Sequence, residues 1–243
     1  MKRIEVKNLK KQFNTIEAVK GINFQINQSE TLALLGPNGC GKTTTIGMLL
    51  GLITPTSGSI FINEQELNYK NHQFLSIMNF ASPYVELPKK LTVLENLKVY
   101  GRMYLIKNLK DKIDQLVEDL NLKSFLNKRT GELSSGQKNR VSLAKSLIND
   151  PKILLLDEPT ASLDPDTGDY VRSYLEKYKQ ENDISILLAS HNMDEVTSLS
   201  DDVLMMKEGH IIDHGKAKEL IDKHGRDTLE QVFLKLVREK NEH

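Results

Sequence analysis

The sequence predicts an α/β fold built around a buried parallel sheet. Three short apolar runs, at residues 31–35, 153–156 and 184–188, are typical of strands covered on both faces, because half-exposed strands alternate apolar and polar residues. Glycines, two carboxylates and a histidine follow these runs closely. Since ligands of parallel sheets bind at the carboxyl ends of the strands, we expect one site to form there.

Composition limits the possible functions. The 243 residues suffice for one large α/β domain or for two smaller lobes that share a core. Lys+Arg and Asp+Glu both number 33, so net charge favours neither nucleic acid nor an anionic membrane. Cys40 is the single cysteine, which excludes an internal disulfide and a cysteine-rich metal site. There is no secretory signal and no apolar run long enough to span a bilayer, so we expect a soluble protein.

A glycine-rich loop follows the first apolar run. It reads G-x-x-x-x-G-K-T over Gly36, Pro37, Asn38, Gly39, Cys40, Gly41, Lys42 and Thr43, and Thr44 follows it. Such a loop points backbone N–H groups at a phosphate, and the helix predicted over 44–52 adds its positive N-terminal end. We expect Lys42 to reach the β- and γ-phosphates and Thr43 to ligate Mg²⁺. The alternative is a glycine-rich turn that precedes a lysine by chance.

The remaining N-terminal segments are short. Alternating residues predict half-buried strands at 3–7 and 22–26, and a further strand is predicted at 59–62. We place Phe13 in a polar loop over 10–17. Two roles are open for this aromatic: packing on the core, or offering a flat face on which an adenine ring stacks.

Residues 84–148 are predicted to form an inserted helical lobe between core segments 1–83 and 149–243, because apolar residues recur at helical spacing from Leu91 onward. Within it, the run Leu133–Gln137 precedes an amphipathic helix. Ser134 or Ser135 would cap that helix, and the alternative role is a second anion site at the helix N-terminus.

Charged side chains end the two other buried runs. Asp157 can hold Mg²⁺, and Glu158 can take a proton from an attacking water. The alternative is that both carboxylates cap the turn before Pro159. His191 follows the third run, and it is a catalytic candidate mainly because of that position. Beyond it, a hairpin around Glu208-Gly209 and closing helices over 216–224 and 228–240 complete the predicted fold.

These motifs, in this order and spacing, resemble the nucleotide-binding subunit of ATP-binding cassette (ABC) transporters over essentially the whole chain. The motifs are Walker A (Gly36–Thr43), the signature (Leu133–Gln137), Walker B (Ile153–Asp157, then Glu158), the D-loop (Ala161–Asp164) and the switch histidine (His191). The resemblance implies a P-loop NTPase core with a mixed sheet flanked by helices, an antiparallel β subdomain and the inserted α-helical subdomain.

The resemblance also implies a mechanism. ATP and Mg²⁺ would be the cofactors, and two ATP molecules would lie between the subunits of a head-to-tail dimer, expected to be a homodimer. The signature residues Ser134, Ser135, Gly136 and Gln137 would close the site over the ATP held by the other subunit. Ser134 and Gly136 would contact its γ-phosphate. Glu158 would be the general base, His191 would stabilise the γ-phosphate and the water, Asp164 would connect the two sites, and Phe13 would stack on adenine.

By the same resemblance, the partner is a transmembrane permease, no nucleic acid is expected, and the subunit would sit at the cytoplasmic face of the inner membrane. The C-terminal run 228–236 resembles the ABC-2-type exporter subgroup, although an amphipathic closing helix explains its apolar spacing equally well. One departure stands out. The family's loop glutamine, which touches Mg²⁺, is matched here by Ser82, with Ala81 as the alternative register. A serine hydroxyl has a shorter reach, so either water bridges it to the metal or this contact is missing.

Two other functions are open. An ABC-type ATPase that acts on ribosomes or DNA usually has two cassettes or a long coiled coil, and this chain has neither. A GTPase would need N-K-x-D, and residues 127–130 lack the aspartate.

Overall fold

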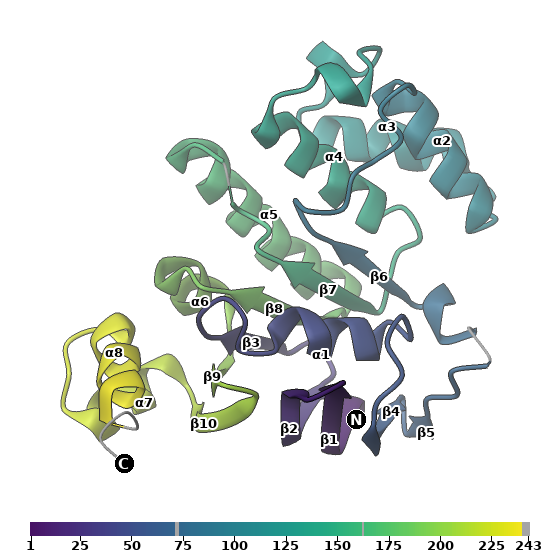
Figure 1. The fold of residues 1–243 in the computed structure, drawn as a ribbon. Helices are drawn as coiled ribbons and strands as arrows, with labels where there is room; N and C mark the ends of the chain where they lie inside the picture. The colour runs from purple at the N-terminus through teal and green to yellow at the C-terminus, as the bar shows by residue number, and fades with distance from the viewer. Residues whose placement is uncertain (71–72, 162, 240–243) are drawn as a thin grey trace. The chain divides into compact units, whose positions relative to one another are not determined.

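The computed structural model describes residues 1–70, 73–161 and 163–239. The chain folds into two compact units, residues 1–74 with 185–243 and residues 75–184. The helical segment predicted at 84–148 lies inside the second unit, which also contains two strands and a long helix (Figure 1). Among the described residues, no helix combines the length and the apolar character needed to cross a membrane.

The first unit contains an antiparallel sheet in the order β2-β1-β4-β5. Its strands are β1 (Lys2–Phe13), β2 (Ile16–Asn27), β4 (Ser57–Ile62) and β5 (Gln65–Glu66). The prediction of a polar loop over 10–17 was wrong. β1 and β2 continue through this segment, and Phe13 is paired with Ile16. This end of the hairpin is largely exposed, so its residues lack the apolar alternation that predicts a strand.

The first unit also contains a mixed set of strands. β3 (Thr31–Leu35) pairs in parallel with β8 (Ser185–Ser190) and with β9 (Asp202–Lys207), and β10 (His210–Gly215) runs antiparallel to β9. Every residue of β3 and β8 is buried, which explains why both strands are largely apolar, with polar residues only at their ends. Glu208 and Gly209 both have positive φ, 48° and 84°, so the predicted hairpin turn is confirmed.

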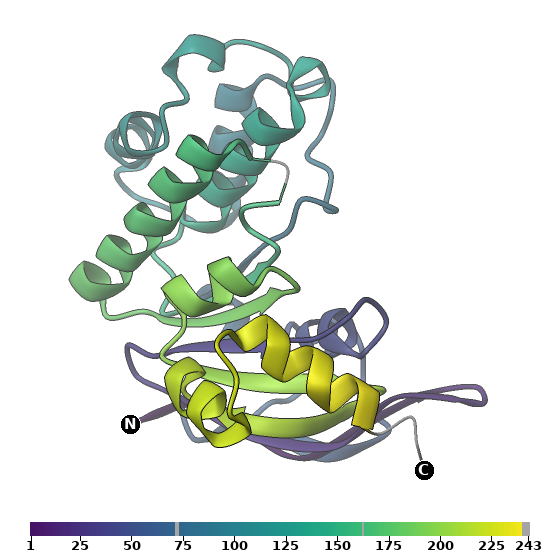
Figure 2. The ribbon, with the colours of Figure 1, turned by 90° about the vertical axis from the view of Figure 1, so that its left-hand side faces the viewer.

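Four α-helices accompany these strands among the described residues of the unit. They are α1 (Lys42–Leu49), α6 (Met193–Leu199), α7 (Ala217–His224) and α8 (Leu229–Glu239). The closing helices α7 and α8, yellow in Figure 2, lie side by side. α8 buries Leu229, Val232 and Phe233, so its apolar spacing serves packing.

The second unit combines two parallel strands with helices. β6 (Met78–Ala81) pairs with β7 (Ile153–Asp157), and the helices are α2 (Val93–Met103), α3 (Leu109–Asp119), α4 (Ser135–Ser146) and α5 (Pro165–Asn182). α5 was not among the predicted elements. Its sequence signals are Asp164 as the N-cap and Pro165 at the first position, followed by buried Val171 and Leu175.

Candidate nucleotide site

The glycine-rich loop joins β3 to α1 in the first unit. Gly39 and Gly41 have φ of 82° and 112°, a region that other residues rarely adopt. A Cβ on Gly36 would collide with the carbonyl oxygen of Met206, so the chain passes too close there for a side chain. No described side chain caps α1 and its first turn has no acidic residue, so its backbone N–H groups can face an anion.

Lys42 lies within this loop. Its Nζ donates to the carbonyl oxygens of Gly36 and Pro37 at 2.5 and 3.2 Å, and the residue is 6% exposed. The ammonium group is therefore bonded to carbonyl oxygens of its own loop, and a phosphate would replace these oxygens as its partner. Thr43 is exposed at the start of α1, while Cys40 is buried, and burial raises the pKa of its thiol.

His191 leaves the sheet beside this loop. Leu35 at the end of β3 is paired with Ser190 at the end of β8, and His191 is the next residue. The glycine-rich loop and the exposed His191 therefore follow the carboxyl-terminal ends of two neighbouring parallel strands. Phe13 lies at the end of the β1–β2 hairpin, 44% exposed, with the Lys11 ammonium group 4.8 Å from its ring centroid.

In the second unit, the two predicted carboxylates lie at the end of β7. Asp157 is 4% and Glu158 6% exposed. Glu158 has φ of 53°, a left-handed conformation that is uncommon for a residue with a side chain and frequent at functional sites. The Tyr84 hydroxyl donates to Glu158 Oε2 at 3.4 Å. The sequence had not pointed to Tyr84, because nothing in its local pattern reveals a contact 74 residues away.

The signature begins α4, and Ser134 is its cap. Ser134 Oγ accepts from the backbone N–H of Gln137 at 3.2 Å, and Gln137 Oε1 accepts from that of Ser134 at 3.1 Å. The predicted cap is thus confirmed, and Ser134 rather than Ser135 provides it. Ser134 and Ser135 are both exposed, and Gly136 lies in the first turn of the helix.

The D-loop ends in another cap. Asp164 Oδ1 accepts from the backbone N–H of Thr167 at 3.0 Å, and this hydrogen bond lowers the pKa of Asp164. Asn139 of α4 donates from Nδ2 to the carbonyl oxygen of Ala161 at 3.0 Å, so the signature helix touches the D-loop directly. Ser162, which belongs to the predicted D-loop, lies outside the described residues.

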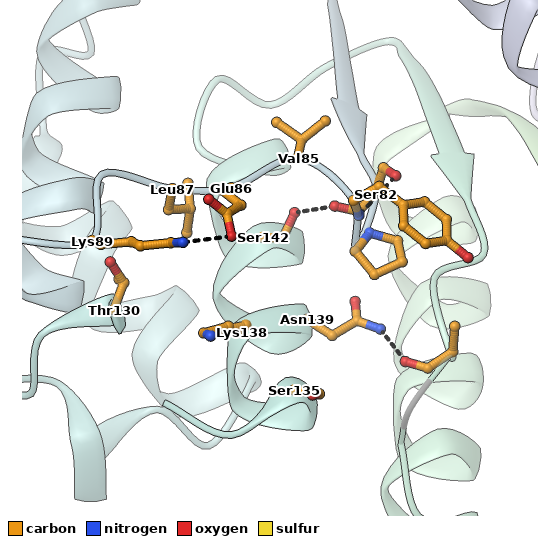
Figure 3. A pocket seen from close by; sticks show the side chains of 13 residues that line it. Ser82, Val85, Glu86, Leu87, Lys89, Thr130, Ser135, Lys138, Asn139 and Ser142 are labelled. Carbon is orange, nitrogen blue, oxygen red and sulfur yellow. Dashed lines mark hydrogen bonds and ion pairs between the residues drawn. The ribbon is translucent and has the colours of Figure 1, made fainter. Parts of the chain in front are cut away.

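A cavity of about 270 Å³ lies between α4 and the loop that follows β6 (Figure 3). Ser82 borders it and is 3% exposed. Ser82 Oγ accepts from the backbone N–H of Tyr84 at 3.3 Å, and its carbonyl oxygen accepts from Ser142 Oγ at 3.5 Å. The Ser82 hydroxyl, which the resemblance aligns with the Mg²⁺-contacting glutamine, therefore also stabilises the turn of its own loop.

Comparisons with known proteins identify the family. Residues 19–161 match the family described as ABC transporter. The chain belongs to this family. The ABC relatives include the Nod factor export ATP-binding protein I of Rhizobium sp. (strain N33), which is 34% identical over 95% of this chain and 76% of the relative. They also include the Fe(3+) ions import ATP-binding protein FbpC of Escherichia coli (strain K12), 32% identical over 89% of this chain and 63% of the relative.

Solved ABC structures share the fold. A dimeric, post-hydrolysis ATP-binding cassette, MJ0796, bound to ADP and Pi, has a TM-score of 0.82 and is 25% identical, over 88% of this chain and 98% of that one. The predicted P-loop NTPase fold with its mixed sheet and antiparallel β subdomain is confirmed. The chain is an ABC transporter ATP-binding subunit, and it hydrolyses ATP.

Proposed function

We propose that this chain drives a separate membrane permease as a head-to-tail homodimer that encloses two ATP molecules. The observation that carries the proposal is the presence of two helix N-termini suited to phosphate. α1 begins at the glycine-rich loop, α4 begins at exposed Ser134 and Ser135, and neither helix has an acidic residue in its first turn. One phosphate chain needs only one such loop, so the second helix end is available to an ATP held by another subunit.

The chemistry follows from the donors at each site. Backbone N–H groups of the loop and Lys42 would hold the β- and γ-phosphates. Glu158 would accept the proton of a water whose oxygen attacks the γ-phosphorus, while the bond to the bridging oxygen breaks and ADP leaves. His191 would stabilise the γ-phosphate and that water, Asp164 would connect the two sites, and Phe13 would offer its ring to adenine.

We propose Mg²⁺ as the metal, held by the two residues that the resemblance to ABC cassettes assigns to it. Thr43 offers a hydroxyl and Asp157 a carboxylate, and hard oxygen ligands of this kind fit Mg²⁺. When bound, the ion would neutralise charge on the phosphates.

We also propose that transport runs outward, with the subunit at the cytoplasmic face of the membrane. The support is the resemblance of residues 228–236 to the ABC-2 exporters and the exporting Nod factor relative. A transport assay in inverted vesicles with the copurified permease tests the direction. ATP-driven uptake into the vesicles supports export, and ATP-driven release from loaded ones contradicts it.

Glu158→Gln is the decisive variant for the ATPase cycle. Without the carboxylate, we expect ATP to bind normally while turnover falls by about 10²–10⁴-fold, the usual range for a lost general base. A dimer should then accumulate with ATP, which gel filtration with light scattering would detect. Glu176→Gln, at an exposed position on α5, is the matched control and should hydrolyse ATP normally. Wild-type turnover by Glu158→Gln would contradict the proposal.

A further inference from the structure

We infer that Tyr84 is a positioning residue for Glu158, and that its hydroxyl is the group through which the loop after β6 reaches the hydrolytic centre. The inference rests on the proposed role of Glu158 as general base. It concerns the place where this chain lacks the glutamine that its resemblance to ABC cassettes leads one to expect.

In the loop after β6, Ser82 is buried and Tyr84 is exposed. Ser82 is buried, and its hydroxyl and carbonyl oxygens are bonded to Tyr84 N–H and Ser142 Oγ (Figure 3). This arrangement, a serine side chain closing a turn over two residues, holds the loop tightly where it leaves β6. Two residues beyond Ser82, the Tyr84 side chain is 72% exposed, yet its Oη lies 3.4 Å from Glu158 Oε2.

The hydrogen bond runs from the tyrosine to the glutamate. Tyr84 Oη is the donor and Glu158 Oε2 is the acceptor, since an ionised carboxylate can only accept. The bond holds one carboxylate oxygen of Glu158, and this fixes the direction in which the carboxylate is presented to the attacking water.

The position of Glu158 also explains why the Tyr84 hydroxyl matters. Glu158 is buried and has a left-handed backbone, a combination that is frequent at functional sites. A catalytic base must point at its water within hydrogen-bond reach, and small rotations are costly. The contact of 3.4 Å is long for an O–H···O bond, as contacts of catalytic groups often are before the substrate binds.

Tyr84→Phe removes only the hydroxyl and tests the inference. We expect kcat for ATP hydrolysis to fall roughly three- to tenfold, the loss expected for one hydrogen bond, with the KM for ATP and the melting temperature unchanged. Tyr170→Phe is the matched control. Its hydroxyl, in the same unit, donates to the backbone oxygen of Asp119 at 2.6 Å, and its loss should leave kcat unchanged.

A double-mutant cycle separates positioning from a general effect on the loop. In a Glu158→Gln background, Tyr84→Phe should leave the residual single-turnover rate unchanged, because the carboxylate that it positions is gone. An unchanged or increased kcat for Tyr84→Phe alone would overturn the inference, as would a full additional loss in the Glu158→Gln background. If Glu158→Gln itself hydrolyses ATP normally, the base assignment fails first. If Glu158→Gln is inactive and Tyr84→Phe is normal, only the role of Tyr84 fails.

Discussion

Ser134 and Gln137 satisfy each other's backbone N–H groups at the start of α4, with donor–acceptor distances of 3.1 and 3.2 Å. This capping box fixes the first turn of the signature helix. Ser134 therefore has a structural role whether or not it also meets a phosphate of another subunit, and a useful variant must separate the two.

Ser134→Asp makes this separation. Aspartate caps helices as well as serine does, so we expect the free energy of unfolding to be nearly unchanged. Its negative charge would face the γ-phosphate of the opposing ATP, so ATP-dependent dimerisation should be lost. Ser134→Arg should block the dimer too, but it removes the cap and should cost about 1 kcal/mol of stability. Both variants should still bind ATP as monomers, which a fluorescent ATP analogue would measure.

The control for Ser134→Asp is Thr92→Asp. Thr92 and Glu95 form the same type of capping box at the start of α2, outside the proposed nucleotide site. Thr92→Asp should dimerise normally with ATP. Loss of ATP binding by monomeric Ser134→Asp would contradict the assignment of the signature to the other subunit's nucleotide.

Lys145 predicts an unusual pH dependence of stability. Burial lowers its pKa to about 8 from 10.5, and its Nζ donates to the carbonyl oxygen of Phe80 at 2.7 Å. Between pH 8 and 10.5 the unfolded chain binds more protons at this lysine than the folded chain does, so its contribution to stability rises with pH. Relative to Lys145→Met, the wild type should gain up to about 3 kcal/mol across this window.

Urea unfolding at several pH values would measure this change. Lys145→Arg is the second variant, since a guanidinium stays charged throughout the window and should remove the same slope. If the pH curves of the wild type and both variants run parallel, burial does not weaken the charged form of Lys145.

Two glycines with left-handed backbones should respond differently to alanine. Gly225, with φ of 60°, has open space around it, so Gly225→Ala should cost only the backbone strain of about 1 kcal/mol. Gly58, with φ of 89°, lies against the backbone of Asn8 and Leu9, and a Cβ there would overlap both. Gly58→Ala should cost about 3 kcal/mol or more, because strain and overlap add. Equal losses in urea unfolding would contradict this.

The burial of each element explains whether it could be predicted from the sequence. β3, β7 and β8 are buried on both faces, and their apolar central residues indicate that burial directly. The end of the β1–β2 hairpin is held by backbone pairing with little burial, so its sequence resembles a loop. α5 has caps that a sequence can show, but its apolar residues are sparse along 18 positions.

The candidate site also contains residues that the sequence could predict and residues that it could not. The predicted residues follow strand ends and helix starts, positions that short motifs encode, so the glycine-rich loop, Asp157, Glu158 and Ser134 could be proposed from the sequence. Tyr84 could not, because its contact with Glu158 depends on how a single turn after β6 orients neighbouring side chains. Which serine caps α4 was equally open, since Ser134 and Ser135 are both good caps.

Ser82→Ala distinguishes two roles for the loop serine. If Ser82 ligates Mg²⁺, as its alignment with the family glutamine predicts, the Mg²⁺ concentration that gives half-maximal hydrolysis in Ser82→Ala should rise.

The structure favours a different result for Ser82→Ala. Ser82 Oγ is bonded to the N–H of Tyr84, so its loss should loosen the turn that carries the Tyr84 hydroxyl to Glu158. We therefore expect an unchanged Mg²⁺ titration together with a kcat lowered by a factor of about three, the cost of a weakened hydrogen bond. In the double variant Ser82→Ala/Tyr84→Phe, kcat should match that of Tyr84→Phe alone, because Ser82 acts through Tyr84. A shifted Mg²⁺ titration would restore Ser82 as a metal ligand.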